Sequence, residues 1–251
     1  MNKMIVVLAC VLLCAPAYAD KKKSLEQWTS EQRTPSVIDG VTIYRPTIAN
    51  GKFSYGDIVN YATSTSNDLA FTRALVYVIQ QLNSETESIE SIDFENHRFV
   101  CSREIVNEEG SNTYAFTEAF QFENGIMTFM SPEIIVKYKD KLVINKRVPF
   151  HKLDPENKES HFAFVEEFSL MNSRFIAGIV NAVESLNVVP VKNWAAVSRG
   201  KAVNGMNTTE VLLTEGKPDN ITESANHTKW MYGAYRIVIF DNGIVERVVN
   251  F

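Results

Sequence analysis

The stretch that decides the fold of this 251-residue chain is TYAFTEAFQFENGIMTFM, residues 113–130. Its aromatic residues alternate with smaller or polar neighbours: Tyr114, Phe116, Phe120 and Phe122. Because side chains two residues apart lie on the same side of a strand, these rings are predicted to share one face of a β-sheet. Asn124-Gly125 follows, and Asn-Gly between two such runs is a strong signal for a hairpin. Residues 126–138 are predicted to run back beside the aromatic strand, with Pro132 marking an edge position or a bulge.

Two amphipathic helices are predicted on either side of this region in the sequence. Apolar residues recur at spacings of three and four from Leu69 to Leu82, after Asn67 or Asp68 as the predicted cap. The same spacing extends through residues 160–186. Residues 89–94 and 98–105 are predicted strands joined by a tight turn, and Asp39-Gly40 indicates an earlier hairpin. This order predicts an α+β fold in which helices cover one face of an antiparallel sheet.

The extended run Val188-Val189-Pro190 separates this domain from a small C-terminal module. We expect residues 35–189 to form the first domain and residues 190–251 the module. Two short helices and then three strands are predicted in the module, an α-α-β-β-β order. The ends of these elements are marked by capping and turn signals. Asn207 and Glu210 form a capping box, Gly216 and Pro218 a helix stop, and Gly243 lies in a hairpin turn.

Several C-terminal motifs resemble those of the SmpA/OmlA family, the group of BamE-like envelope proteins. They are Gly205-Met206, Glu210-Val211, Gly216-Lys217-Pro218, Trp230-x-Tyr232 and Val238-x-Phe240-Asp241-x-Gly243-x-Val245. The first domain resembles, more faintly, exported Gram-negative proteins of unknown function with a TATA-binding-protein-like (TBP-like) fold, through Ile89-Glu90-Ser91-Ile92-Asp93-Phe94-Glu95 and the aromatic hairpin. That second resemblance implies a curved antiparallel sheet backed by two helices, and it implies nothing about DNA.

The first 19 residues have the composition of a secretory signal peptide. Lys3 forms a short basic region, Met4–Ala15 is largely apolar, and Ala17-Tyr18-Ala19 places small residues at the expected cleavage site. A lipoprotein is disfavoured, because Leu13 before Cys14 is too large for a lipidation signal and cleavage at Cys10 leaves too short an apolar region. Residues 20–34 are predicted to be a flexible lead-in. We therefore expect an exported protein, periplasmic or secreted by a Gram-negative bacterium.

Composition narrows the functional classes. The net charge is −5, and it becomes −6 once Lys3 leaves with the signal. An acidic exported chain argues against nucleic-acid binding. Removing the signal also leaves Cys101 as the single cysteine, so no internal disulfide forms, and its apolar strand neighbours indicate a buried hydrophobe rather than a reactive thiol.

No catalytic constellation is visible in the sequence. None of the four histidines is spaced for a metal motif, and no nucleophile elbow or phosphate loop occurs. His151 and His161 flank Asp154, Glu156 and Glu159, but a charged loop is more often solvated than metal-bound. We expect no cofactor and no metal. Glycosidase carboxylates can lie far apart in sequence, so a hydrolase of glycans or peptides stays an alternative.

These observations favour a non-enzymatic envelope protein that acts through contact with another protein. Trp230, Tyr232 and Tyr235 are the candidate contact residues, because aromatic anchors concentrate binding energy. The competing interpretation is that Trp230 and Tyr232 belong to the core of a small sheet. A further alternative is an inhibitor of an envelope enzyme. The partner and the oligomeric state cannot be derived from these residues.

Overall fold

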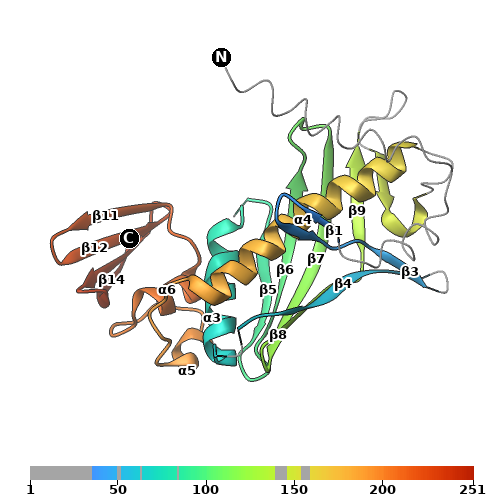
Figure 1. Ribbon diagram of the computed structural model, residues 1–251. Helices are drawn as coiled ribbons and strands as arrows, with labels where there is room; N and C mark the ends of the chain where they lie inside the picture. The colour runs from blue at the N-terminus through green and yellow to red at the C-terminus, as the bar shows by residue number, and fades with distance from the viewer. Residues whose placement is uncertain (1–35, 50–51, 63, 84, 139–145, 154–158) are drawn as a thin grey trace, which may run out of the picture.

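The computed structural model of the chain (Figure 1) describes residues 36–49, 52–62, 64–83, 85–138, 146–153 and 159–251. The predicted signal peptide and lead-in therefore lie outside the described residues. In chain order the elements are β1 (Ser36–Ile38), β2 (Val41–Ile43), β3 (Thr47–Ala49), β4 (Lys52–Asn60), α3 (Asn67–Gln81), β5 (Ser88–Asp93), β6 (Arg98–Val106), β7 (Asn112–Glu123), β8 (Ile126–Ser131), β9 (Ile134–Tyr138), β10 (Lys146–Pro149), the 3-10 helix η1 (Phe150–Lys152), α4 (Glu159–Ser185), α5 (Trp194–Val197), α6 (Thr208–Glu215), β11 (Asn220–Ser224), β12 (His227–Tyr232), β13 (Arg236–Asp241) and β14 (Ile244–Asn250).

The aromatic strand β7 is the centre of an eight-stranded antiparallel sheet. One side of β7 pairs with β6, which pairs in turn with β5. The other side pairs first with β9 and then with β8, and these are continued outward by β10 and by β4 and β3. Pro132 lies in the break between β8 and β9. Both strands have neighbours on two sides, so the predicted edge position is wrong. The alternative of a bulge fits, because three residues, 131–133, lie opposite only Thr117 and Glu118 of β7.

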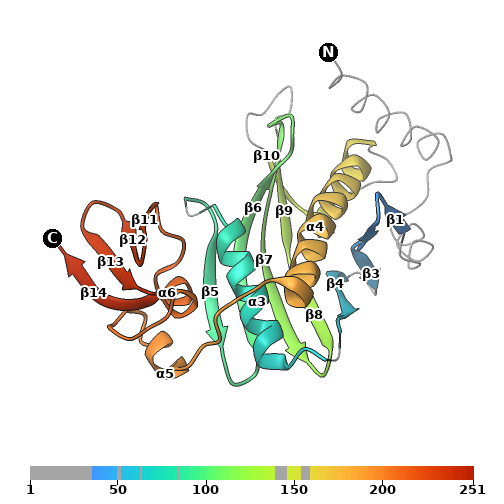
Figure 2. The ribbon, with the colours of Figure 1, turned by 60° about the vertical axis from the view of Figure 1, so that its left-hand side comes forward.

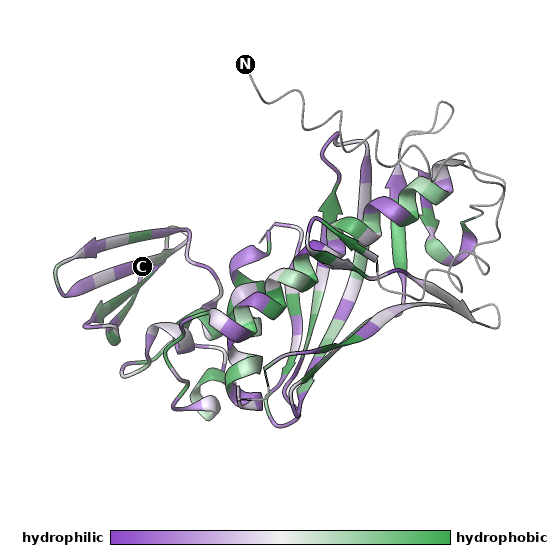
Figure 3. Ribbon diagram, in the orientation of Figure 1, coloured by the Kyte–Doolittle hydropathy of each residue, from purple (hydrophilic) through white to green (hydrophobic). Residues whose placement is uncertain are grey.

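Helices α3 and α4 pack on one face of this sheet (Figure 2). The aromatic rings of β7 point toward them and are 0–5% exposed: Tyr114, Phe116, Phe120 and Phe122. Phe168 of α4 is completely buried, and its ring lies 5.1 Å from Phe116 and 5.1 Å from Tyr55 between centroids. Apolar positions recur along the strands and helices of this layer (Figure 3). The predicted α+β class, an antiparallel sheet backed by two helices, is confirmed.

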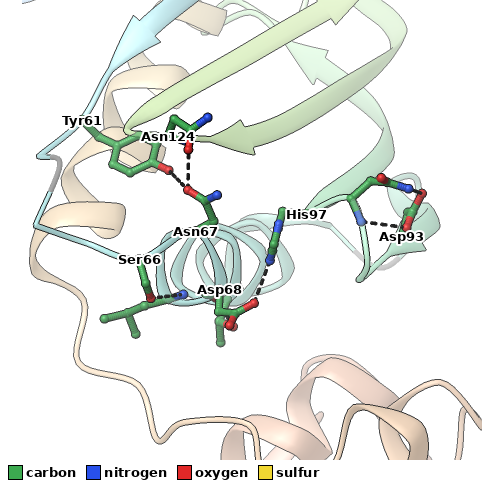
Figure 4. Close-up of polar contacts among 10 residues, drawn as sticks. Tyr61, Ser66, Asn67, Asp68, Asp93, His97 and Asn124 are labelled. Carbon is green, nitrogen blue, oxygen red and sulfur yellow. Dashed lines mark hydrogen bonds and ion pairs between the residues drawn. The ribbon is translucent and has the colours of Figure 1, made fainter.

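The first residues of α3 are tied to the turns at the end of the sheet (Figure 4). Ser66 is the N-cap, and its hydroxyl accepts the Leu69 N–H at 3.3 Å, so the predicted cap at Asn67 or Asp68 is wrong by one or two residues. Asn67 instead accepts the Asn124 N–H at 2.9 Å through its side chain. Asp68 pairs with His97 at 2.7 Å. Asn67 and Asp68, which come directly after the cap, therefore hold the helix to the β7–β8 and β5–β6 turns.

The C-terminal module contains four strands rather than the predicted three. β11, β12, β13 and β14 form one antiparallel sheet in that order. The additional strand β11 is exposed at all five positions, so it lacks the alternation of apolar and polar residues by which a strand is recognised. The capping box of Asn207 and Glu210 is confirmed, and Gly216 ends α6 with a φ of 80°.

The hydrophobic core of the first domain continues into the module. Val197, Leu212 and Leu213 belong to the same buried cluster as the rings of β7. The Trp194 ring lies 4.5 Å from the Phe94 ring, which follows β5. A smaller cluster inside the module contains Met206, Val211, Val238, Phe240 and Val245. The proposed division at residue 190 stays a prediction. Helix α6 lies against α3, and Trp194 of α5 lies against Phe71 of α3 and Phe94 after β5.

Candidate functional site

A groove of about 560 Å³ lies between the first domain and the module, and we call it the β5–α6 groove. One wall is β5 with its flanks, residues 87–92 and 94. The other wall is residues 213–217 at the end of α6, with residue 197 at the end of α5 and residues 198 and 200 after it. Ile79 of α3 and Leu82, the C-cap of that helix, complete the lining. In Figure 2, β5 is the strand of the main sheet that lies nearest the module.

The wall formed by β5 is a free sheet edge. β5 pairs with β6 alone among the described strands. Within the described residues, no backbone hydrogen bond outside the β5–β6 ladder involves Ser88–Asp93. An edge strand presents unpaired N–H and C=O groups, which can pair with another extended chain. The register shifts between Ile89 and Ser91, and this irregularity leaves Glu90 without a partner in the ladder.

The groove combines apolar side chains with an acidic rim. Ile89, Ile92 and Phe94 are half-buried, and Leu213 is 7% exposed. Three carboxylates and a single ammonium group, that of Lys217, are in its lining. The apolar groups can exclude water from a bound chain, and the carboxylates favour a cationic one.

Two of the three groove carboxylates are held by groups of this chain. Glu87 accepts the Asn83 N–H at 2.7 Å and the Glu104 N–H at 3.1 Å. Glu215 accepts the Ala202 N–H at 2.6 Å and pairs with Arg236. Glu90 is exposed, and in the part of the chain that the structure describes its carboxylate accepts only the Ser88 hydroxyl, at 2.8 Å. Glu90 is therefore the carboxylate that is free to meet a ligand.

A second polar cluster lies beneath α4, sealed from solvent. Glu118 is 0% exposed, and its carboxylate accepts the Asn172 amide at 2.8 Å. Arg103 donates to the Asn172 carbonyl at 2.6 Å, lies 3.6 Å from Glu118, and places its guanidinium 3.4 Å from the centre of the Phe175 ring. Burial raises the pKa of Glu118 to about 7, although Arg103 and Asn172 both favour the ionised form. Because this carboxyl group is completely buried, the cluster is suited to holding α4 on the sheet.

The raised pKa of Glu118 makes stability depend on pH. The folded chain retains the Glu118 proton up to about pH 7, whereas the unfolded chain releases it near the ordinary value of 4.5. Between these values the unfolded state binds fewer protons, so we expect the free energy of unfolding to fall by about 3 kcal/mol from pH 4.5 to pH 7 and then to level off. Urea denaturation across this range, compared with Glu118→Gln, measures it. A Glu118→Gln variant with the same slope as the natural chain would contradict the assignment.

The three predicted contact residues differ in their surroundings. Trp230 is half-buried against Phe240, with ring centroids 4.9 Å apart, and it touches both core clusters. Tyr232 is half-buried and donates its hydroxyl to the Gly216 carbonyl at 3.2 Å. Tyr235 is 72% exposed at the turn before β13. Trp230 and Tyr232 therefore have structural partners, Tyr235 is open to solvent, and their role in binding stays a prediction.

The residues predicted to cap helices and form turns in the module lie at helix ends and in turns. Asn207 accepts the Glu210 N–H at 3.0 Å, and Glu210 accepts the Asn207 N–H at 2.8 Å. Met206 is 3% exposed inside the module core. Gly205, Gly216 and Gly243 have φ between 78° and 89°, which favours glycine. Glu210 also accepts the N–H groups of Lys192 and Asn193, so the capping box fastens the chain before α5.

Cys101 is completely buried and free, as predicted, and burial raises the pKa of its thiol. His161 is 4% exposed, with its ring beside Phe164, and His151 is exposed. Asp154 and Glu156 lie outside the described residues, so the loop weighed as a cation site cannot be assembled from them. No group of three or more metal-ligating side chains lies within the described ranges.

The sequence predicted neither the β5–α6 groove nor the buried cluster around Glu118. Glu118 stands at the same period as Phe116 and Phe120, so its position on the buried face could have been read from the alternation. The free edge of β5 had no such signal, because strand order is decided by pairing across the sheet. Helices in the described part of the chain are too short or too polar to cross a membrane.

No protein-family model and no curated protein matches the chain. Among solved structures it is similar to a TBP-like protein from Parabacteroides distasonis ATCC 8503, with a TM-score of 0.46 and 14% identity over 54% of this chain and 95% of that one. It is also similar to a DUF4468 family protein from Bacteroides ovatus ATCC 8483, with a TM-score of 0.45 and 8% identity over 58% of this chain and 94% of that one. The α+β assignment rests on this chain's own strand pairings, and the SmpA/OmlA resemblance of residues 190–251 stays a prediction.

Proposed function

We propose that this chain is an exported, non-enzymatic protein of the cell envelope that binds another protein in the β5–α6 groove. The observation that carries the proposal is the free edge of β5 facing a groove lined by apolar and polar side chains together. Edge strands are normally covered or blunted, and the irregularity at Glu90 interrupts this edge at one position. The backbone on either side of Glu90 stays open beside apolar side chains, an arrangement suited to recognition. The signal-like first 19 residues support export, and the SmpA/OmlA-like motifs of the module support a role in envelope assembly.

The arrangement of carboxylates supports binding over hydrolysis. A hydrolase that uses a carboxylic acid as its general acid, as most glycosidases do, needs a carboxyl group of raised pKa beside its substrate. Among the described residues, the carboxyl group whose pKa is raised by burial is Glu118, which lies under α4 and does not line the groove. In the groove, Glu87 and Glu215 are engaged by N–H groups and arginine as described above, so they serve to shape the walls.

Site-specific photocrosslinking in the native envelope tests the proposal. A benzophenone amino acid replaces Ser91 on β5 or Ser198 beside α5, both exposed at the groove. Thr117, exposed on the sheet face opposite the helices, is the matched control. We expect a discrete crosslinked partner from Ser91 and Ser198 and none from Thr117. Partner capture from Thr117 alone would place the contact on the open sheet face and contradict the proposal.

A further inference from the structure

We infer that the β5–α6 groove binds its partner as an extended segment added as a strand to β5, with apolar side chains at alternate positions and a lysine or arginine opposite Glu90. This inference rests on the proposed function and specifies the partner's chemistry. In strand addition the backbone hydrogen bonds supply affinity and the pockets beside the edge supply specificity. Both features are present here, since a free backbone edge and apolar side chains line the same groove.

The wall formed by the end of α6 limits what can pair with β5 to a single extended chain rather than a whole sheet. An added strand lies about 4.8 Å from its neighbour, so one extended segment needs little width. Residues 213–217 bound the same space as residues 87–92. A second copy of this protein, aligned edge to edge through its own β5, would bring a sheet and its helices into the position of α6. Because α6 bounds this space, the inferred occupant is one extended segment of a partner rather than a second sheet.

Side-chain chemistry specifies the segment further. Alternate side chains of an added strand point to the same side, so one set faces the apolar groups Ile89, Ile92 and Leu213. The other charged groups of the lining have partners: Glu87 and Glu215 as given above, and Lys217 through the Gln80 carbonyl at 3.4 Å. The exposed Glu90 at the ladder irregularity is thus the carboxylate that a cationic side chain of the partner would meet. An acidic or uncharged segment leaves this carboxylate without an opposite charge.

Selection of peptides on the mature chain tests the inference. A phage-displayed library of random dodecapeptides is panned on the purified protein, with a variant carrying Ser198→Trp, which fills the groove, as counter-selection. We expect selected peptides to carry apolar residues at period two together with lysine or arginine. Selection of no groove-dependent peptide, or of peptides with apolar residues at spacings of three and four, would overturn the inference.

Backbone methylation then separates strand addition from other ways of filling the groove. Two versions of one selected peptide are N-methylated at odd or at even positions, and binding is measured by fluorescence anisotropy. Since alternate N–H groups of a strand face its neighbour, we expect one version to lose at least tenfold in affinity and the other to stay within threefold. Equal loss or equal retention for the two versions would overturn the inference. If Ser91 still captures a protein in the envelope, the proposed function survives that failure.

The contribution of Glu90 is measured with the same peptide. Glu90→Gln should weaken binding about two- to fivefold at low salt, as expected for an exposed ion pair. Glu223→Gln on β11, exposed and outside the groove, is the matched control and should leave binding unchanged. An equal effect of both variants, or no effect of Glu90→Gln, would refute the charge preference.

Discussion

Replacing Arg103 by methionine is expected to lower the free energy of unfolding by about 3–5 kcal/mol at pH 7.5. Arg103 is 7% exposed and is the cation beside the fully buried Glu118. Its loss leaves the carboxylate without a charge partner and the Asn172 carbonyl without its donor. Methionine keeps an unbranched apolar stem against the Phe175 ring, so the effect reports charge more than packing. Urea denaturation of the natural chain and the variant gives the difference.

The double variant Arg103→Met/Glu118→Gln is the control for this interpretation. Glutamine removes the buried charge and keeps an oxygen that can accept the Asn172 amide, so we expect the double variant to recover at least half of the loss. The penalty of Arg103→Met should also shrink at pH 5, where Glu118 is protonated in the folded state because its pKa is about 7. A double variant as unstable as Arg103→Met alone would show that the loss comes from packing.

Replacing Trp194 by alanine is expected to cost about 3 kcal/mol and to loosen the module from the first domain. The Trp194 ring lies 4.5 Å from the Phe94 ring and 6.0 Å from the Phe71 ring between centroids. These rings belong to the first domain, whereas Trp194 begins α5 beside the groove. Truncation therefore removes the aromatic contact that holds one groove wall in place.

Hydrogen exchange with mass spectrometry distinguishes loosening from general destabilisation. After Trp194→Ala, amides of α5 and α6 should lose protection before those of β6 and β7. Tyr235→Ala is the matched aromatic control, and because Tyr235 is 72% exposed its effect should stay within about 0.5 kcal/mol. Uniform loss of protection over both domains after Trp194→Ala would contradict a local role.

Much of the fold could be predicted because its signals are local. The alternation in residues 113–123 and Asn124-Gly125 predicted β7 and its hairpin, and helical spacing predicted α3 and α4 to within two residues at either end. The capping box at Asn207 followed from two side chains three residues apart. β11 was missed because its burial pattern is uniform. For Pro132 an edge position and a bulge were both predicted, and the edge position is wrong because the pairing of β8 with β4 and of β9 with β10 leaves no signal near the proline.

By themselves, the residues of this chain determined the sequence positions of most helices and strands, the buried face of β7 and the buried state of Cys101. These follow from periodicity, which each segment carries in its own side chains. The order in which the strands pair decided the free edge of β5 and the surroundings of Glu118. β5 became a free edge because its only described partner is β6, and Glu118 met Arg103 and Asn172 because β7, β6 and α4 pack together. Groups that are distant in sequence come together only through packing, so both the groove and the buried charge cluster belong to the tertiary structure.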